Sequence, residues 1–167
     1  LVGDDGWADG RLGDPLGTQV MLNDFLLIGD LRGVEREELL SRLNRLGDAA
    51  AARLSPRLEQ AARHCEDVIV VTHPPPYRGA CWHEGEISPP DWLPWMTCDA
   101  VGRAIDRCAE RHEGTRFTVL CGHTHGAGCY SPRSNLAVHT AAARYGHPAP
   151  SAMVHLERSG VRVEIDV

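Results

Sequence analysis

The chain has 167 residues and a formal net charge of −6, and 43% of its residues are hydrophobic. This length can bury a real core, so we expect one domain over residues 1–167. The acidic balance argues against a nucleic-acid-binding surface, which is normally basic. No run approaches the ~20 apolar residues of a membrane span. No secretory signal is visible, so we expect a cytoplasmic protein, although a removed signal would equally explain the start at Leu1.

The six cysteines lack the CxxC spacing of redox and zinc motifs. Disulfide frameworks are typical of small secreted domains that have little apolar core. Reduced thiols are therefore the expected state of these side chains. They are Cys65, Cys81, Cys98, Cys108, Cys121 and Cys129.

The amino-terminal part is predicted to contain a loop and short strand segments. Leu1–Gly3 is typical of the end of a strand. Glycine and aspartate dominate residues 1–20, which predicts a loop around Trp7. The apolar run Asp24–Gly29 predicts a short strand.

Two segments show the apolar period of amphipathic helices. From about Glu35 to Cys65, leucine and alanine recur at helical spacing. Gly47 and Pro56 interrupt this run, so we expect either two helices or one broken helix. A further helix is predicted over Asp99–His112.

Buried strands are predicted at Val68–Thr72 and Thr115–Cys121, because both are rich in β-branched and apolar residues. A long segment, His73–Thr97, follows the first of them and contains six prolines and three tryptophans. Long loops in compact domains are usually functional or disordered. Tryptophans are rare in disordered segments, so we expect an ordered loop.

The carboxyl-terminal part has a different pattern of short alternating runs. Strands are predicted at Leu136–Ala142, Ala152–Glu157 and Val161–Val167, and Ser159-Gly160 predicts a hairpin turn between the last two. Strand–helix–strand units thus give way to an antiparallel tail. The fold class is predicted to be α/β, with mixed sheets.

Three histidines follow the two predicted buried strands directly. His73 follows the first strand, and His123 and His125 follow the second in a Gly-His-Thr-His turn. The carboxyl ends of adjacent parallel strands open onto one crevice, where α/β proteins bind ligands. Neutral imidazole binds Zn, Fe, Ni and Mn ions. We therefore predict a metal site here; the alternative is a hydrogen-bonded turn in which the histidines cap the strand ends.

His73 and the turn Gly122–His125, about fifty residues later, resemble the calcineurin-like metallophosphoesterase family. The similarity covers roughly residues 65–167, and the loop segments Cys81–Gly85 and Asp91–Pro94 resemble a bacterial branch of that family. The resemblance implies a four-layer α/β/β/α sandwich with a dinuclear metal centre between its sheets.

For the residues of this chain, the resemblance implies that His73 and His123 bind one divalent ion and that His125 binds the other. The ions would be Mn, Fe, Zn or Ni, and two are expected in the complete protein. A metal-bridging water or hydroxide would attack a phosphate-ester substrate, because two ions lower its pKa and stabilise the transition state.

The earlier motifs of the family have no counterpart in the sequence. They are an Asp-x-His, a Gly-Asp-x-x-Asp and a Gly-Asn-His-Asp/Glu, and neither Gly3-Asp4-Asp5 nor Gly13-Asp14 has their spacing. We expect these motifs in a segment before Leu1, and little or no hydrolysis by the 167 residues alone. The sheet would then expose an unpaired edge. We expect a dimer contact or the missing segment to cover that edge.

Five residues are candidate substrate contacts. Arg11 could hold a phosphate through two hydrogen bonds, and the others lie on the long loop that begins at His73. The set is Arg11, Tyr77, Arg78, His83 and Glu84. His139 and His147, in the tail, are weaker candidates for the active site, and the remaining histidines, His64, His112 and His155, are expected in structural roles.

Two other functions are compatible with the same residues. One is a non-catalytic metal-binding or partner-binding remnant of the same fold. The other is a structural zinc domain in which Cys121 or Cys129 joins the histidines, although these residues lack zinc-knuckle spacing.

Overall fold

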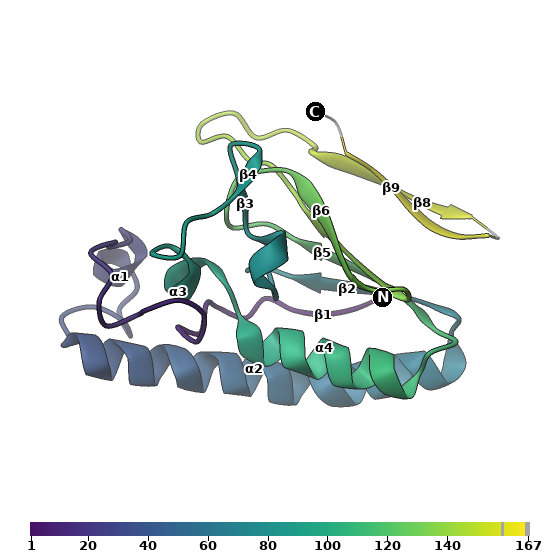
Figure 1. The fold of residues 1–167 in the computed structure, drawn as a ribbon, viewed down its shortest axis with the longest axis horizontal. Helices are drawn as coiled ribbons and strands as arrows, with labels where there is room; N and C mark the ends of the chain where they lie inside the picture. Colours follow the sequence, from purple (N-terminus) through teal and green to yellow (C-terminus); the bar gives the residue numbers. More distant parts are fainter. Residues whose placement is uncertain (158, 166–167) are drawn as a thin grey trace.

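The structure, a computed structural model, describes residues 1–157 and 159–165. Its centre is a five-stranded sheet with the order β1-β2-β5-β7-β6 (Figure 1). The first four strands of this order are parallel, and β6 pairs with β7 antiparallel. The strands are β1 (Val2–Asp4), β2 (Asp67–Thr72), β5 (Arg116–Cys121), β7 (Leu136–Thr140) and β6 (Gly128–Arg133).

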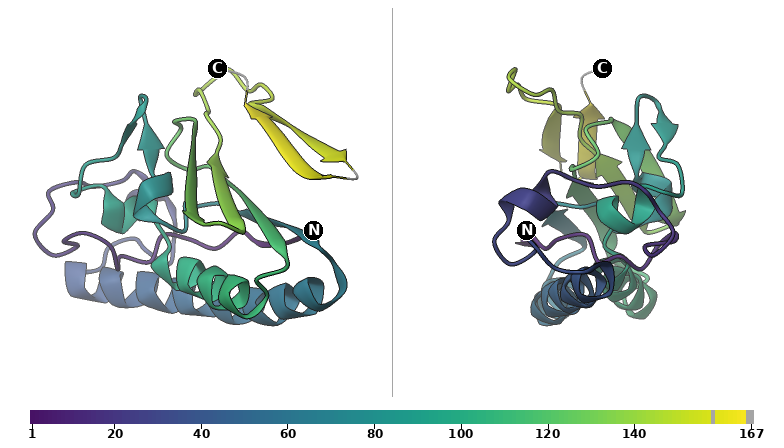
Figure 2. Two further views of the ribbon diagram at one scale, coloured as in Figure 1. Left: turned by 45° about the vertical axis from the view of Figure 1, so that its right-hand side comes forward. Right: turned by 90° about the vertical axis from the view of Figure 1, so that its left-hand side faces the viewer.

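Two helices, α2 (Arg36–His64) and α4 (Asp99–Arg111), lie side by side against one face of this sheet (Figures 1 and 2). The face is apolar because Val70, Val119 and Val138 are in register on neighbouring strands and fully buried. Burying each valine stabilises the fold by about 1.5–3 kcal/mol. The main core of the molecule therefore lies between these two helices and the sheet.

The segment from Arg36 to His64 is one helix of 29 residues, although Pro56 lies inside it. Proline removes a hydrogen bond to the carbonyl four residues earlier, here that of Ala52. Both Ala52 and Pro56 are exposed, so water can satisfy that carbonyl, while Leu54 and Leu58 hold the helix on the core. Tertiary packing therefore overrides the predicted break.

The predicted strand Asp24–Gly29 is wrong. This segment forms the short helix α1 (Asp24–Leu27). It lies away from the central sheet (Figure 1), so no strand is available to pair with it, and its amides bond locally, as in Ile28 N to Asp24 O at 2.8 Å. Phe25 anchors the helix by packing edge-on against Trp95, with ring centroids 5.3 Å apart.

The long loop after β2 is ordered, as predicted, and contains short elements. They are a 3₁₀ turn η1 (Arg78–Ala80), the hairpin strands β3 (Trp82–His83) and β4 (Glu86–Ile87), and helix α3 (Leu93–Met96). Glu84 and Gly85 both have positive φ at the hairpin turn, as a type I′ turn requires. Strand β6 was not predicted; its Pro132 is tolerated because β6 lies at the sheet edge.

The predicted carboxyl-terminal hairpin is confirmed. Strands β8 (Ala152–Glu157) and β9 (Gly160–Ile165) pair antiparallel in a two-stranded sheet of their own, and positions 166 and 167 of the predicted last strand fall outside the described residues. The hairpin lies on the side of the sheet away from α2 and α4 (Figures 1 and 2). The fold is therefore mixed α/β, with a mixed central sheet and antiparallel strand pairs.

The β1 edge of the sheet is held by arginines of α2. Arg57 donates to the carbonyl of Gly3 at 2.9 Å, and Arg53 forms two hydrogen bonds with the carboxylate of Asp4, at 2.7 and 2.8 Å. Charged side chains along an edge disfavour pairing with another strand. Within the described residues, no helix combines the length and apolar character that a bilayer span requires.

Candidate functional site

Parallel pairing of β2 with β5 brings His73 and His123 together. Val70 and Val119 are register partners, so both strands end at the same edge of the sheet. The two loops that follow are joined directly, because Gly122 N donates to the His73 carbonyl at 2.9 Å. The imidazole centroids of His73 and His123 lie 4.7 Å apart, at an interplanar angle of 64°.

The turn that carries His123 and His125 has a strained backbone. Their φ angles are +69° and +63°, a region that non-glycine residues rarely adopt. Gly126 follows, where an added Cβ would lie 2.5 Å from the Trp82 carbonyl oxygen, so only glycine fits. Such strain costs of order 1–3 kcal/mol per residue and clusters at functional sites.

Two histidines are oriented by backbone carbonyls. His123 Nε2 lies 3.1 Å from the Trp95 carbonyl oxygen, and His83 Nδ1 lies 3.0 Å from that of Thr124. A carbonyl can only accept, so these nitrogens carry the protons. The lone pairs are assigned to Nδ1 of His123 and Nε2 of His83. Metal-ligating histidines show this arrangement, with the second ring nitrogen donating to a fixed acceptor.

Trp7 packs on the histidine pair from the amino-terminal loop. Its ring stacks on His73 at 5.8 Å and meets His123 edge-on at 5.0 Å. Burial lowers the pKa of His73 and of His123, and the Asp24 carboxylate opposes this shift in both. Both imidazoles are therefore neutral at pH 7, which is the form that binds a metal.

A cavity of about 640 Å³ opens over these side chains. Four histidines line it: His73, His83, His123 and His125. Its other walls come from the amino-terminal loop, α1, the loop before α3, and Tyr145, whose ring meets that of His125 at 4.6 Å. The volume is in the range of small-molecule sites.

The types of side chain in the cavity suit a metal ion, but the distances between their donor atoms suit it less well. Imidazole suits the ions predicted from the sequence. The donor atoms of His73, His123 and His125 do not all lie within 4.8 Å of one another in the part of the chain that the structure describes. One ion can therefore take two of these imidazoles more readily than three. Asp24, which the sequence reasoning missed, is the one carboxylate among the described residues that line the cavity.

Of the five predicted substrate contacts, the structure places His83 in the cavity. Tyr77 donates to the Gly102 carbonyl at 3.1 Å and packs against Tyr130. Glu84 lies exposed at the β3–β4 turn, and Arg78 is exposed on η1. Arg11 is held by carboxylates, as described next.

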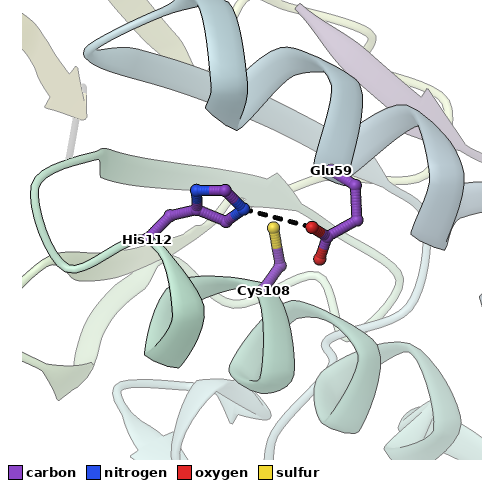
Figure 3. Close-up of side chains that lie close together, drawn as sticks. All are labelled: Glu59, Cys108 and His112. Carbon is purple, nitrogen blue, oxygen red and sulfur yellow. Dashed lines mark hydrogen bonds and ion pairs between the residues drawn. The ribbon is translucent and has the colours of Figure 1, made fainter.

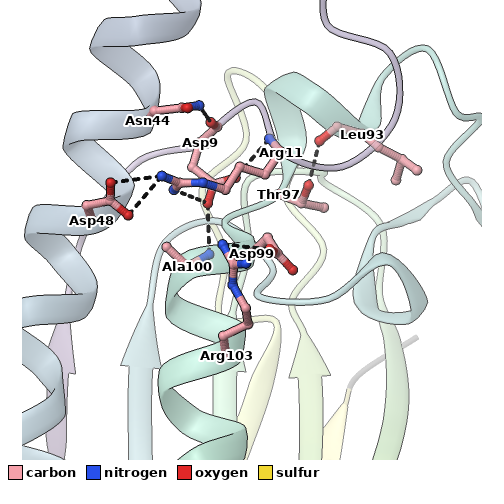
Figure 4. Close-up of polar contacts among 9 residues, drawn as sticks. All are labelled: Asp9, Arg11, Asn44, Asp48, Leu93, Thr97, Asp99, Ala100 and Arg103. Atoms are coloured by element: carbon pink, nitrogen blue, oxygen red, sulfur yellow. Dashed lines mark hydrogen bonds and ion pairs between the residues drawn. The ribbon is translucent and has the colours of Figure 1, made fainter.

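Arg11 belongs to a network that ties the amino-terminal loop to both helices (Figure 4). Its guanidinium bonds Asp9 at 3.0 Å and both carboxylate oxygens of Asp48 at 2.8 Å. Asp9 is fully buried and also accepts from Ala100 N, at the start of α4, at 2.8 Å. Asn44 of α2 donates to the Asp9 carbonyl at 2.6 Å. Asp9 thus positions the loop that carries Trp7.

Another group of side chains of metal-binding types lies at the α2–α4 interface (Figure 3). The donor atoms of Glu59, Cys108 and His112 lie within 4.8 Å of one another. Hydrogen bonds from Arg111 and His112 lower the pKa of Glu59 to about 2. Burial, with the nearby Glu59 charge, raises the pKa of the Cys108 thiol to about 12. Because the Glu59 carboxylate is already paired with Arg111 and His112, we interpret this group as a contact between helices.

The remaining histidines and cysteines do not extend the site. His155 pairs with Glu164 at 3.2 Å, whereas His64 and His147 are exposed. His139 is half-buried, and burial lowers its pKa. The Cys121 thiol is within 3.4 Å of the Thr140 hydroxyl, and burial raises its pKa to about 12. Among the described residues, neither Cys121 nor Cys129 joins a group of three metal donors.

Comparisons with known proteins do not assign this site. The chain matches no known protein family and none of the curated protein sequences.

Proposed function

We propose that the chain supplies part of the active site of a divalent-metal-dependent phosphoesterase. One observation carries this proposal: two parallel strand ends bring His73 and His123 to a ring separation of 4.7 Å beside a cavity of about 640 Å³. Strand ends of parallel sheets are the usual place for ligand sites in α/β proteins. The resemblance of His73 and Gly122–His125 to calcineurin-like metallophosphoesterases supplies the reaction class.

In this proposal each histidine has a defined role. His73 and His123 hold one ion, with Nδ1 of His123 as donor because its Nε2 is engaged by Trp95. His125 holds a second ion. The metals are Mn, Fe, Zn or Ni, and they would activate water and stabilise charge on the transferring phosphoryl group. His83, fixed by Thr124, faces the substrate.

We extend the proposal to a four-layer sandwich around the central sheet. The face of the sheet opposite α2 and α4 carries Ile69 and Leu120, which are partly exposed, and Val71, which is 43% exposed. A second sheet on this face would bury these apolar side chains. It would include the β8–β9 hairpin and strands from a second copy or from a segment outside the 167 residues.

Calorimetric titration of the chain with Mn²⁺ tests the metal site. His123→Ala should weaken Mn²⁺ binding at least tenfold, because it removes a donor whose orientation is already fixed. The control is His147→Ala, which changes an exposed histidine that does not line the cavity. Equal Mn²⁺ affinity in the wild type and both variants would contradict the proposal.

The alternative is a metal-binding module of the same fold without hydrolysis. Its support is that Asp24 is the one carboxylate among the described cavity residues, whereas a bridging carboxylate normally completes a dinuclear centre. Hydrolysis of p-nitrophenyl phosphate with Mn²⁺ separates the two functions. Mn²⁺ binding without turnover, both by this chain and by any longer protein that contains it, would support the module.

A further inference from the structure

We infer that the histidine cavity selects esters that carry a single phosphate and a planar apolar group, and that it disfavours ligands with a second phosphate. The preferred form is the diester, which carries one negative charge. This inference rests on the proposed phosphoesterase function and adds its substrate class. It follows from the charges and side-chain types of the cavity walls.

The cavity lacks the cations that proteins normally use for additional phosphates. The sequence contains no lysine, and no arginine among the described residues lines the cavity. Arg11, which the sequence suggested as a phosphate contact, is bound to Asp9 and Asp48. Arginine and lysine are the common partners of phosphate oxygens. A phosphate away from the metal site would therefore find no positive side chain on these walls.

The one formal charge on the described walls is negative. Asp24, at the start of α1, lines the same cavity as His73 and His123. Its carboxylate would repel each added negative charge on a ligand. This repulsion is smallest for a ligand with one charge, such as a diester, and larger for a monoester or pyrophosphate.

The opposite property, a large apolar surface, is present beside the histidines. Trp7 and Tyr145 contact the rings of His73 and His125, and Trp92 at the start of α3 is 41% exposed. Met21, 56% exposed, and Met96 extend the same lining. Aromatic faces bind planar groups by stacking, whether these are nucleobases or simple aryl rings. The apolar surface begins next to the imidazoles, so such a group would stack close to the phosphorus.

Calorimetry on the Mn²⁺-loaded chain tests the substrate class with diphenyl phosphate, a dinucleoside monophosphate, inorganic phosphate and pyrophosphate. We expect at least one of the two aromatic diesters to bind at least tenfold more tightly than pyrophosphate. Tighter binding of the dinucleoside monophosphate would identify a nucleobase as the planar group, and tighter binding of diphenyl phosphate would identify a simple aryl group.

Two substitutions separate the apolar and the charge contributions. Trp92→Ala should weaken diphenyl phosphate binding about tenfold and change inorganic phosphate less than twofold, because only the first ligand has a ring to stack. Leu27→Ala, an exposed apolar residue of α1 outside the cavity, is its control. Asp24→Asn should strengthen pyrophosphate binding severalfold, with Asp30→Asn as control.

Each outcome bears on a different claim when Mn²⁺ binding is measured first in every variant. If the wild type binds Mn²⁺ but prefers pyrophosphate or binds all four ligands equally, the substrate class is wrong and the metal site stands. If Trp92→Ala weakens the binding of diphenyl phosphate and of inorganic phosphate equally, stacking on Trp92 does not explain the binding of diphenyl phosphate. The inference then also fails. If the wild type does not bind Mn²⁺, both the proposed function and this inference are overturned.

Discussion

The histidine cavity and the α2–α4 interface both place histidine beside other polar side chains, but they differ in how those side chains are paired. At the interface, Glu59 accepts from Arg111 and His112, and the Cys108 thiol is kept protonated by burial. In the cavity, His123 and His83 each use one nitrogen on a backbone carbonyl and leave the other for a ligand.

The backbone shows the same contrast. Cys108 lies in a regular helix, whereas His123 and His125 adopt positive φ angles at a turn. A strained turn whose side chains keep free donor atoms is typical of a binding site, and a regular helix whose polar groups are paired is typical of a structural contact. If the distance between donor atoms were the only criterion, the α2–α4 interface would be chosen as the metal site instead of the cavity.

The largest effect is expected where the two regions are connected, at Asp9. Asp9→Ala leaves the Arg11 guanidinium and the Ala100 amide without their buried partner, so the free energy of unfolding should fall by about 3 kcal/mol. Asp48→Ala removes the exposed partner of the same arginine and should cost less than about 0.5 kcal/mol. Urea denaturation measures both, and equal losses would show that Asp9 does not connect these elements.

The next effect tests whether the interface cluster is a stabilising contact. The pKa of Glu59 is lowered from 4.5 to about 2 in the folded chain. The contribution of its ion pairs is therefore complete above pH 4.5 and is lost as the pH falls toward 2. Glu59→Gln should lower the free energy of unfolding by about 1–2 kcal/mol at pH 7, since partial exposure weakens the pairs.

Urea denaturation at pH 7 and at pH 3 measures this difference. The gap between the wild type and Glu59→Gln should narrow at the lower pH, because protonation removes the same charge that the substitution removes. Glu38→Gln, which alters an exposed ion pair with Arg42 on the same helix, is the control and should have a smaller effect at pH 7. A constant gap would mean that the Glu59 charge does not contribute.

The buried strands and the helix at 99–111 could be predicted from the sequence because their apolar periods match the faces that they bury. The juxtaposition of His73 with His123 followed from the same strands, since parallel neighbours end at one edge. Asp24–Leu27 forms a helix because it lies away from the central sheet and so has no strand to pair with. The apolar run of this segment does not reveal where it lies in the fold.

Long-range contacts set the remaining parts of the site. Asp24 and Tyr145 are far apart in sequence and line one cavity only because the loops before α2 and after β7 converge there. Neither residue belongs to a motif that the sequence reasoning could use. The pairing of Arg11 with Asp48 could not be predicted for the same reason, because Asp48 lies 37 residues away on α2.

A smaller effect is expected at the strained turn. His125→Gly should raise the free energy of unfolding by about 0.5–1 kcal/mol in EDTA, because glycine adopts the φ of +63° without strain. The same variant should bind Mn²⁺ more weakly than the wild type. Thr124→Gly is the matched control at a position without positive φ, and it should destabilise the chain. Thermal unfolding with and without Mn²⁺ measures both properties, and destabilisation by His125→Gly in EDTA would argue against strain at this residue.

The smallest effect, a change in Zn²⁺ affinity, is expected from Cys108→Ser. This substitution tests whether the α2–α4 interface binds a metal. A thiol with a pKa of about 12 remains protonated at pH 7, and its neighbour Glu59 is already held by Arg111. Zn²⁺ would have to displace both the proton and the arginine, so the substitution should change Zn²⁺ affinity less than twofold. Competition with a chromophoric chelator measures this affinity, with His123→Ala as the variant that should lose it. If Cys108→Ser loses Zn²⁺ and His123→Ala retains it, the metal site is at the α2–α4 interface, and the pairing of donor atoms is the wrong criterion for choosing between the two regions.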